Sequence, residues 1–254
     1  MRHFNSDGID IAYLDETPDE GPGEPILLIH GFASNSRRNW VGTGWLTALR
    51  NAGRRVIAHD NRGHGESEKL YDRASYGSPL MAEDARRLLD YLEIARADVM
   101  GYSMGARIAA FLALHHPDRV RGLIFGGLGI GMVRGVGDPQ PIIRALEAAR
   151  AEDVVDPVAR AFRTFADQSK GDLKALAACM GSARQKISEE EIGRLRQPVL
   201  VAVGSEDRIA GSPHQLAALI ANAEVLIVPR RDHITAIGDK AFKEGVLDFL
   251  ARRP

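Results

Sequence analysis

The pentapeptide Gly-Tyr-Ser-Met-Gly at residues 101–105 constrains the fold of this chain more than any other stretch. The short apolar segment 97–100 before it has the character of the end of a buried strand. After it, apolar side chains recur at three- and four-residue spacing through residue 114, which is typical of a helix. Glycines two residues before and two residues after Ser103 relieve the crowding of so sharp a turn. The pattern therefore predicts a serine hydroxyl exposed at a strand-to-helix turn.

Short apolar runs alternate with amphipathic segments along most of the remaining chain. An unbroken apolar run such as 26–29 suits a strand buried on both faces of a parallel sheet. Strands are predicted at residues 26–29, 55–58, 97–100, 120–125, 199–203 and 225–228, and helices at 45–50, 81–94, 106–114, 213–221 and 240–252. Residues 4–15 predict a hairpin, because Asp7-Gly8 supplies turn residues. Alternating strands and helices form βαβ units, so the predicted fold class is α/β, with a mostly parallel sheet flanked by helices.

Residues 139–195 break this alternation, because they contain helical patterns and no strand pattern. The helical patterns lie at residues 142–150, 158–166, 173–180 and 189–195. A segment of about 60 residues is too small to be expected to fold independently. We therefore expect one domain, with a core of residues 1–130 and 196–254. A helical insertion of about residues 131–195 is expected after the strand that ends near Phe125.

Polar residues with catalytic potential follow several predicted strands, at the carboxyl ends where chemistry collects in an open parallel sheet. Ser103 is one of them, and His233 follows the strand at 225–228. A serine hydroxyl is a poor nucleophile near neutral pH, so it needs a base and a carboxylate that orients this base. His233 is the expected base. Glu206, Asp207 and Asp232 compete for the orienting role, although Asp232 is expected to point away from its neighbour His233 on an extended loop.

The order of Ser103, Asp207 and His233 along the chain resembles the nucleophile–acid–histidine order of the α/β-hydrolase superfamily. Other segments are similar to motifs of that family, namely His-Gly-Phe at 30–32, Asp-Asn-Arg-Gly-His-Gly-Glu-Ser at 60–67, Gly-Ser-Glu-Asp at 204–207 and Asp-His at 232–233. The resemblance covers nearly the whole chain. It implies the α/β-hydrolase fold with a helical lid, and it selects Asp207 as the acid of a Ser103–Asp207–His233 triad.

The resemblance also bears on the residues around this triad. An oxyanion hole is expected from the backbone N–H of Met104, at the start of a helix where the helix dipole helps, and from the backbone N–H of Phe32. His30, His64 and Asp60 lie in family motifs and are expected to support loops. No cofactor is expected for such a site.

The expected activity is the hydrolysis of an ester or related acyl bond of a small molecule through an acyl-serine intermediate. Carbon–carbon bond hydrolysis, perhydrolysis and a lyase reaction are alternatives that use the same triad. A different class is also open, because some family members retain the triad and act as small-molecule receptors. The fold alone does not choose between these functions.

Apolar side chains of the helical insertion are expected to line the substrate pocket together with the ring of Phe32. They are Met132, Phe162, Phe165, Leu176 and Met180, and packing between the helices is an equal alternative for each of them. The same segment carries the arginines Arg134, Arg144, Arg150, Arg160, Arg163 and Arg184. A buried arginine suits a substrate carboxylate, whereas most of these are expected to be solvated.

Composition argues against several other functions. The chain has 254 residues and a formal net charge of −1, so charge does not indicate nucleic acid or an anionic membrane as a partner. No apolar run approaches the ~20 residues of a membrane span, and the first residues lack the apolar core of a signal peptide. The single Cys179 cannot form an internal disulfide, and no Cys/His cluster has metal-ligand spacing. We expect a cytoplasmic protein without a structural metal, and the sequence does not indicate an oligomeric state.

Overall fold

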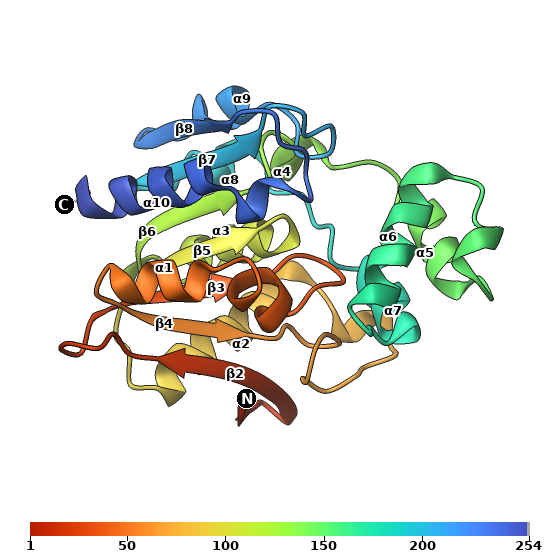
Figure 1. The fold of residues 1–254 in the computed structure, drawn as a ribbon, viewed down its shortest axis with the longest axis horizontal. Helices are drawn as coiled ribbons and strands as arrows, with labels where there is room; N and C mark the ends of the chain where they lie inside the picture. Colours follow the sequence, from red (N-terminus) through yellow and green to blue (C-terminus); the bar gives the residue numbers. More distant parts are fainter. Residues whose placement is uncertain (253–254) are drawn as a thin grey trace.

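The computed structural model describes residues 1–252 and contains one sheet of eight strands in the order β1-β2-β4-β3-β5-β6-β7-β8 (Figure 1). The strands are β1 (Arg2–Ser6), β2 (Ile9–Glu16), β3 (Glu24–Ile29), β4 (Arg54–His59), β5 (Ala97–Tyr102), β6 (Val120–Gly126), β7 (Val199–Gly204) and β8 (Ala223–Val228). β1 pairs with β2, and β2 with β4, in antiparallel fashion, whereas all pairings from β4 to β8 are parallel. The sheet is therefore mostly parallel, with the predicted hairpin at one edge.

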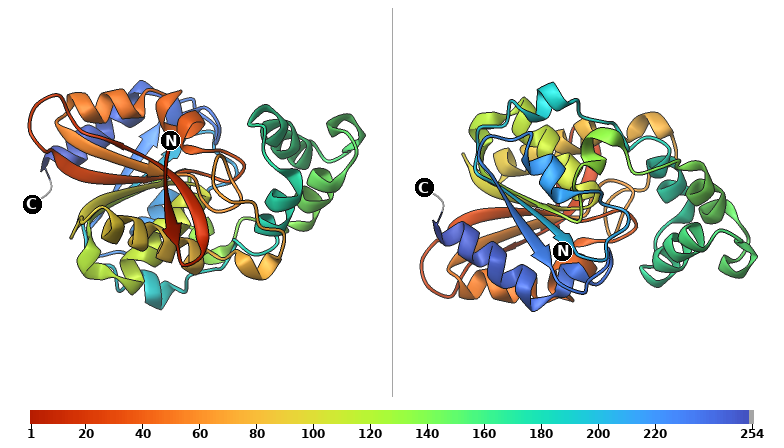
Figure 2. Two further views of the ribbon diagram at one scale, coloured as in Figure 1. Left: turned by 90° about the horizontal axis from the view of Figure 1, so that it is seen from below. Right: turned by 90° about the horizontal axis from the view of Figure 1, so that it is seen from above.

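The central strands are apolar on both faces because helices cover both faces of the sheet. β5 and β7 are buried at every residue. One face is covered by α2 (Ser78–Tyr91), α3 (Met104–His115), α8 (Glu189–Ile192) and α9 (Pro213–Ala217), and the other by α1 (Trp45–Asn51) and α10 (Lys240–Arg252) (Figure 2). This three-layer arrangement brings the carboxyl ends of the parallel strands to one edge of the molecule.

Every strand and helix predicted from the sequence is present in the structure, and the differences lie at the ends of strands and helices. α2 begins at Ser78, before the predicted start, because Pro79 occupies its first turn, where a missing N–H leaves no helical hydrogen bond unmade. α9 ends at Ala217, and the chain continues through turns to β8. The predicted α/β-hydrolase fold class is confirmed.

Between β6 and β7 the described chain forms helices only. They are α4 (Gly131–Arg134), α5 (Gln140–Glu147), α6 (Pro157–Gln168), α7 (Leu173–Met180) and then α8. α5, α6 and α7, here termed the lid helices, stand beyond the carboxyl ends of the strands and pack around an apolar cluster of their own (Figures 1 and 2). α4 and α8 belong to the main core instead, through Met132 and Ile192. The lid helices are thus a narrower segment than residues 131–195.

Candidate active site

Ser103 lies between the end of β5 and the first residue of α3, in a conformation that residues with side chains rarely adopt. Its φ is 54° and its ψ is −111°. A Cβ at Gly101 would lie 2.1 Å from the carbonyl oxygen of Gly105, and a Cβ at Gly105 would lie 2.0 Å from that of Ile29. These two glycines therefore let α3 approach β3 and β5 closely, and the tight turn raises the serine at the edge of the sheet.

Ser103, His233 and Asp207 form a continuous hydrogen-bonded row. Ser103 Oγ lies 3.0 Å from Nε2 of His233, and Nδ1 of His233 lies 2.7 Å from Oδ2 of Asp207. The three residues come from the separate loops that follow β5, β7 and β8, which end at the same edge of the sheet. With Nδ1–H donating to Asp207, Nε2 is the nitrogen that accepts the serine proton.

Asp207 is held as an ionised carboxylate although its side chain is fully buried. Its Oδ1 accepts hydrogen bonds from the backbone N–H groups of Ile209 and Ala210 at 2.8 and 2.9 Å. Burial alone would raise the pKa of Asp207, but hydrogen bonds from His233 and from these two N–H groups lower this pKa below its ordinary value. The carboxylate can therefore balance a positive charge on the imidazole of His233.

The two competing carboxylates face elsewhere. Oδ1 of Asp232 accepts hydrogen bonds from the backbone N–H groups of Ile234 and Thr235 and from the Thr235 hydroxyl, so it closes the turn that follows His233. Glu206 is exposed. Within residues 1–252, neither carboxylate makes a hydrogen bond to the His233 ring. The structure thus places Asp207 against the imidazole, as the resemblance implies.

Tyr102 also contacts His233, and the sequence analysis did not single it out. Its hydroxyl donates a hydrogen bond to the backbone carbonyl of His233 at 2.7 Å, and the two ring centroids lie 5.8 Å apart. Its ring also lines the cavity beside Ser103. The only sequence signal was a polar aromatic residue directly before the serine.

Two backbone N–H groups near Ser103, those of Met104 and Phe32, were predicted to form an oxyanion hole. Met104 is the first residue of α3, so its N–H has no acceptor within the helix. Phe32 follows Gly31, where a Cβ would lie 3.5 Å from Cβ of Ser103. In the part of the chain that the structure describes, neither N–H donates to another protein group. Unused donors beside a nucleophile suit a developing negative charge on a substrate oxygen.

Buried polar side chains fix the loops around the site. Nε2 of His30 accepts the N–H of Asn61 at 2.9 Å, while Nδ1 lies 2.7 Å from the carbonyl oxygen of Gly31, so this ring is neutral with its proton on Nδ1. Burial lowers the pKa of His30 to about 3 and that of His64 to about 4. Asp60 accepts hydrogen bonds from backbone N–H groups of two loop segments. These contacts hold the loops that follow β3 and β4.

Two cavities meet at Ser103. The larger has a volume of about 470 Å³ and the smaller about 50 Å³. Both are lined by Phe32, Ser103, Phe162 and Ile209. The larger cavity is mostly apolar, and its further lining includes Tyr102, Val158, Phe165, Ile234 and Ile237. His233 lines the larger cavity and is absent from the lining of the smaller one.

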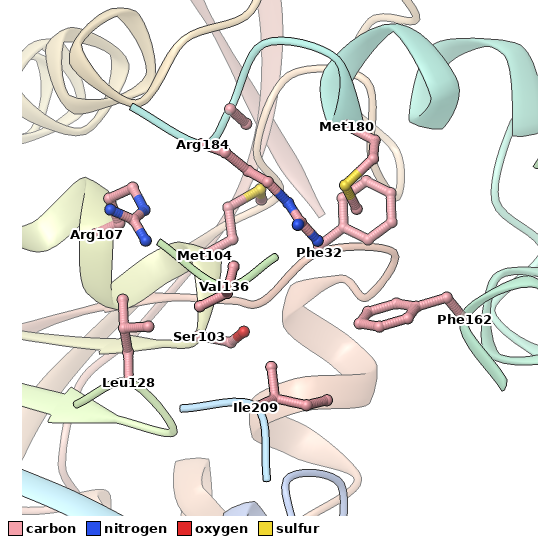
Figure 3. Close-up of a pocket in the computed structure, with 11 residues that line it drawn as sticks. Phe32, Ser103, Met104, Arg107, Leu128, Val136, Phe162, Met180, Arg184 and Ile209 are labelled. Carbon is pink, nitrogen blue, oxygen red and sulfur yellow. The ribbon is translucent and has the colours of Figure 1, made fainter. Parts of the chain in front are cut away.

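The smaller cavity has a different chemical character. Apolar side chains from the core and the lid helices form most of its wall, including Met104, Leu128, Val136 and Met180. Two guanidinium groups, those of Arg107 on α3 and of Arg184 after α7, complete the lining (Figure 3). Among the residues that the structure describes, no carboxylate lines this cavity.

The structure brings Phe32, Phe162, Phe165 and Met180 to the cavities, as predicted, but not Met132. The prediction for Met132 is wrong because this side chain is completely buried in the main core and lines neither cavity. Leu176 is likewise buried among the lid helices and lines neither cavity.

The arginines of the helical insertion separate into different environments. Arg184 lines the smaller cavity. Arg163 is buried in the lid helices, where it pairs with Asp167 and donates to two backbone carbonyls. Arg150 is mostly exposed. Arg107 also lines the smaller cavity, and this role was not predicted. The only indication in the sequence was an arginine four residues after Ser103 in an otherwise apolar helix.

No group of three or more His, Cys, Asp and Glu side chains within residues 1–252 is arranged to hold a metal ion. No helix in the same range has both the length and the apolar character needed to cross a bilayer. The single Cys179 is a buried, free thiol.

Comparisons with known proteins identify the family of this chain. A family model described as the alpha/beta hydrolase fold matches residues 24–164. The chain therefore belongs to the α/β-hydrolase fold family. It is an enzyme of this family, and it is similar in sequence and fold to hydrolases.

Individual relatives span nearly the whole chain. A 2-hydroxymuconate semialdehyde hydrolase from Pseudomonas putida is 32% identical and aligns with 94% of this chain and 92% of its own length. A non-heme chloroperoxidase from Kitasatospora aureofaciens is 27% identical, with 96% of this chain and 97% of that protein aligned. The crystal structure of a hydrolase from Pseudomonas aeruginosa superposes with a TM-score of 0.79 at 25% identity, covering 98% of this chain and 97% of that one.

Proposed function

We propose that this enzyme is a serine hydrolase that cleaves an ester or related acyl bond of a small molecule through an acyl-serine intermediate. The observation that carries the proposal is the row of Ser103 Oγ, the His233 ring and the Asp207 carboxylate, with separations of 3.0 and 2.7 Å. This row opens onto two cavities that share Ser103 in their walls.

Acylation begins when Ser103 Oγ attacks the substrate carbonyl carbon while its proton moves to Nε2 of His233. The carbonyl oxygen becomes an oxyanion that accepts hydrogen bonds from the N–H groups of Phe32 and Met104. Asp207 keeps Nδ1 of His233 protonated and balances the charge of the imidazolium. The tetrahedral intermediate then expels the alcohol, which takes the proton from Nε2, and the acid part remains bound to Ser103.

Deacylation repeats these steps with water as the nucleophile. His233 accepts a proton from water, the resulting hydroxyl attacks the acyl-serine, and Ser103 leaves with the proton returned from Nε2. All groups that this cycle needs are side chains or backbone N–H groups of the chain itself.

A fluorophosphonate probe tests the nucleophile. Because the probe reacts with activated serines, we expect a single adduct on Ser103, detected by intact-mass analysis and peptide mapping. Ser103→Ala should prevent the adduct and lower kcat on an ester substrate by roughly 10⁴-fold or more. An adduct on another residue, or full labelling of Ser103→Ala, would contradict the proposed mechanism.

Carbon–carbon bond hydrolysis is the second candidate. It is favoured by the 32% identity with a 2-hydroxymuconate semialdehyde hydrolase. The same row of residues can serve it when the leaving carbon is stabilised as it takes the proton. A comparison of kcat/KM for neutral esters and for 2-hydroxymuconate semialdehyde, each followed by its absorbance change, decides between the two bonds.

Perhydrolysis and a receptor role remain distinguishable from ester hydrolysis by rate. Formation of peracid from acetate and hydrogen peroxide at a rate above that of ester hydrolysis would favour perhydrolysis. Very slow turnover combined with a large ligand-induced movement of the lid helices would favour a receptor.

A cytoplasmic location, for which the unpaired Cys179 is suitable, is part of the proposal.

A further inference from the structure

We propose that the smaller cavity is a subsite for an anionic group on the acid part of the substrate, and that Arg184 selects this group. The inference rests on the hydrolase activity proposed above and gives it a substrate class. The substrate is an ester with a short acid part that ends in a second carboxylate, such as a succinyl or glutaryl group, and with a large apolar alcohol part.

The position of His233 determines which part of the substrate enters which cavity. The leaving alcohol takes its proton from Nε2 of the histidine, so the alcohol must lie on the histidine side of Ser103. His233 lines the larger cavity only. The alcohol part therefore occupies the larger, mostly apolar cavity, and the acid part points into the smaller one.

The volume of the smaller cavity limits the length of the acid part. Its volume of about 50 Å³ corresponds to roughly four water-sized groups, since one such group needs about 10–15 Å³. Two or three methylene groups and a carboxylate match this space. A long fatty acyl chain does not.

Arg184 supplies a positive charge with no adjacent negative partner. One of its terminal nitrogens donates to the backbone carbonyl of Gly137 at 3.1 Å. Within residues 1–252, no carboxylate lies within ion-pair distance of it, and Asp138 acts on it only from farther away. Figure 3 shows the guanidinium of Arg184 between the side chains of Met104 and Phe32, among the residues that line the smaller cavity. The remaining N–H donors are thus available to a ligand.

Arg107 strengthens the positive field of the same cavity. Its guanidinium donates to the backbone carbonyls of Gly131, Met132 and Gln185 at 3.1, 2.7 and 2.8 Å, so it is fixed in place. Burial and the nearby charge of Arg184 lower the pKa of Arg107 to about 10, which leaves it protonated at neutral pH. Two positive charges that repel one another in a cavity without a carboxylate favour an anionic ligand between them.

The lid helices contain another arginine, Arg163, whose charge, unlike that of Arg184, is paired with a carboxylate. Arg163 is buried, and its charge is balanced by Asp167 and by two backbone carbonyls. Arg184 has one backbone carbonyl and a cavity in front of it. A structural role explains Arg163 completely, whereas it leaves the charge of Arg184 unbalanced.

A matched pair of esters tests the subsite by turnover. 1-Naphthylmethyl hemisuccinate carries the anion, and 1-naphthylmethyl 4-methylpentanoate has nearly the same shape without a charge. Release of 1-naphthalenemethanol is measured by chromatography. The wild-type enzyme should prefer the hemisuccinate by about 10- to 100-fold in kcat/KM, mainly through KM, because a hydrogen bond to a charged group contributes about that much.

Variants of Arg184 should remove this preference selectively. Arg184→Met should lose the preference, so that its kcat/KM values for the two esters become similar, and Arg184→Gln gives a second test if the methionine variant folds poorly. Arg184→Lys should retain part of the preference, since it keeps the charge without the planar donors. Arg150→Met, which removes a mostly exposed arginine of the same segment, is the matched control and should leave the preference unchanged.

A binding measurement separates the subsite from the chemistry. Calorimetric titration of Ser103→Ala with the two esters should show tighter binding of the hemisuccinate, and the double variant Ser103→Ala/Arg184→Met should bind both alike. Equal affinity of Ser103→Ala for the two esters, or a preference that survives in Arg184→Met, overturns the subsite even if neutral esters are hydrolysed. A binding preference without any turnover supports the subsite and contradicts the hydrolase proposal.

Discussion

Asp207 and Asp232 show how the surroundings of a residue, and not its ionisation, define the acid of the proposed triad. Burial raises the pKa of both carboxyl groups, and it is the largest single influence on Asp207 but a lesser one on Asp232. The hydrogen bonds that each carboxylate accepts outweigh burial, so both pKa values lie below the ordinary value. Asp207 directs one oxygen to the N–H groups of its own turn and the other to His233. Asp232 uses Oδ1 for the turn that follows it. A lowered pKa therefore does not distinguish them, whereas the geometry does.

Replacement of each carboxylate should have unequal effects. Asp207→Asn should lower kcat by about 10⁴-fold while the fold is kept, because an amide no longer holds the imidazole in the correct tautomer. Asp232→Asn should cost far less, because its oxygen can still accept from the same turn. Both variants are compared on one ester substrate.

Thermal unfolding of both variants controls for misfolding, and Glu206→Gln serves as an exposed carboxylate control. A crippled Asp232→Asn beside an active Asp207→Asn would show that the wrong acid is assigned, and Ser103 and His233 would then need another partner.

At the scale of elements, the close packing of α3 against β3 and β5 stabilises the tight turn that exposes Ser103. This packing depends on the absence of a side chain at Gly101 and Gly105, because a Cβ at either position would lie 2.1 or 2.0 Å from a backbone oxygen. Backbone atoms of a central strand cannot move aside as a flexible side chain does. The elbow is thus a rigid joint between a strand and a helix.

Gly105→Ala should destabilise the enzyme strongly, because its new methyl group would overlap the Ile29 carbonyl and push α3 away from β3. We expect a loss of several kcal/mol in the free energy of unfolding, about the size seen for overpacked cores, and loss of fluorophosphonate labelling. Chemical denaturation measures the first effect. Gly238→Ala is the matched control, since a Cβ there would lie 3.8 Å from the nearest atom, and an equal loss in both variants would contradict the argument.

The sequence predicts the elements well because their signals are local. Apolar runs and the glycines around Ser103 indicate the strands and the turn, and the polar residues after the strands indicate Ser103 and His233. Asp207 is selected among three carboxylates only by the resemblance to the family. The environment of each face of a helix is not a local property, so the sequence cannot tell that Met132 lies in the main core while Met180 lines a cavity. Arg184 could not be separated from the other arginines for the same reason.

At the scale of the whole molecule, the loops after β3 and β4 enclose neutral histidines. Burial lowers the pKa of His30 to about 3 and that of His64 to about 4, and it also lowers the pKa of His59. In the unfolded chain these rings have a pKa of about 6.5. Between about pH 6.5 and pH 4 the unfolded chain therefore binds protons that the folded molecule does not bind.

The free energy of unfolding should consequently fall as the pH is lowered from about 6.5 to about 4. Each neutral imidazole contributes a slope of up to about 1.4 kcal/mol per pH unit in this window. Carboxylates with a lowered pKa, such as Asp207, add their loss only at lower pH. Urea denaturation at pH 7, 6, 5 and 4.5 measures the slope.

His64→Gln should remove about one of the protons that the chain takes up on unfolding, and this lowers the slope by up to about 1.4 kcal/mol per pH unit. This change in slope does not depend on how the substitution alters the free energy of unfolding at pH 7. A free energy of unfolding that is constant between pH 6.5 and 4.5 would mean that the buried histidines gain no protons on unfolding.

The three carbonyls bound by Arg107 lie at both ends of the segment that bears the lid helices, Gly131 and Met132 where the segment leaves the core and Gln185 where it returns. The two ends thus meet at one side chain of α3. A segment that starts and finishes at one point can be exchanged for another of different length without stretching the sheet. The lid helices that line the cavities can therefore change without a change in the row of Ser103, His233 and Asp207. Grafting the lid helices of one relative onto another should alter substrate selectivity and keep the catalytic residues.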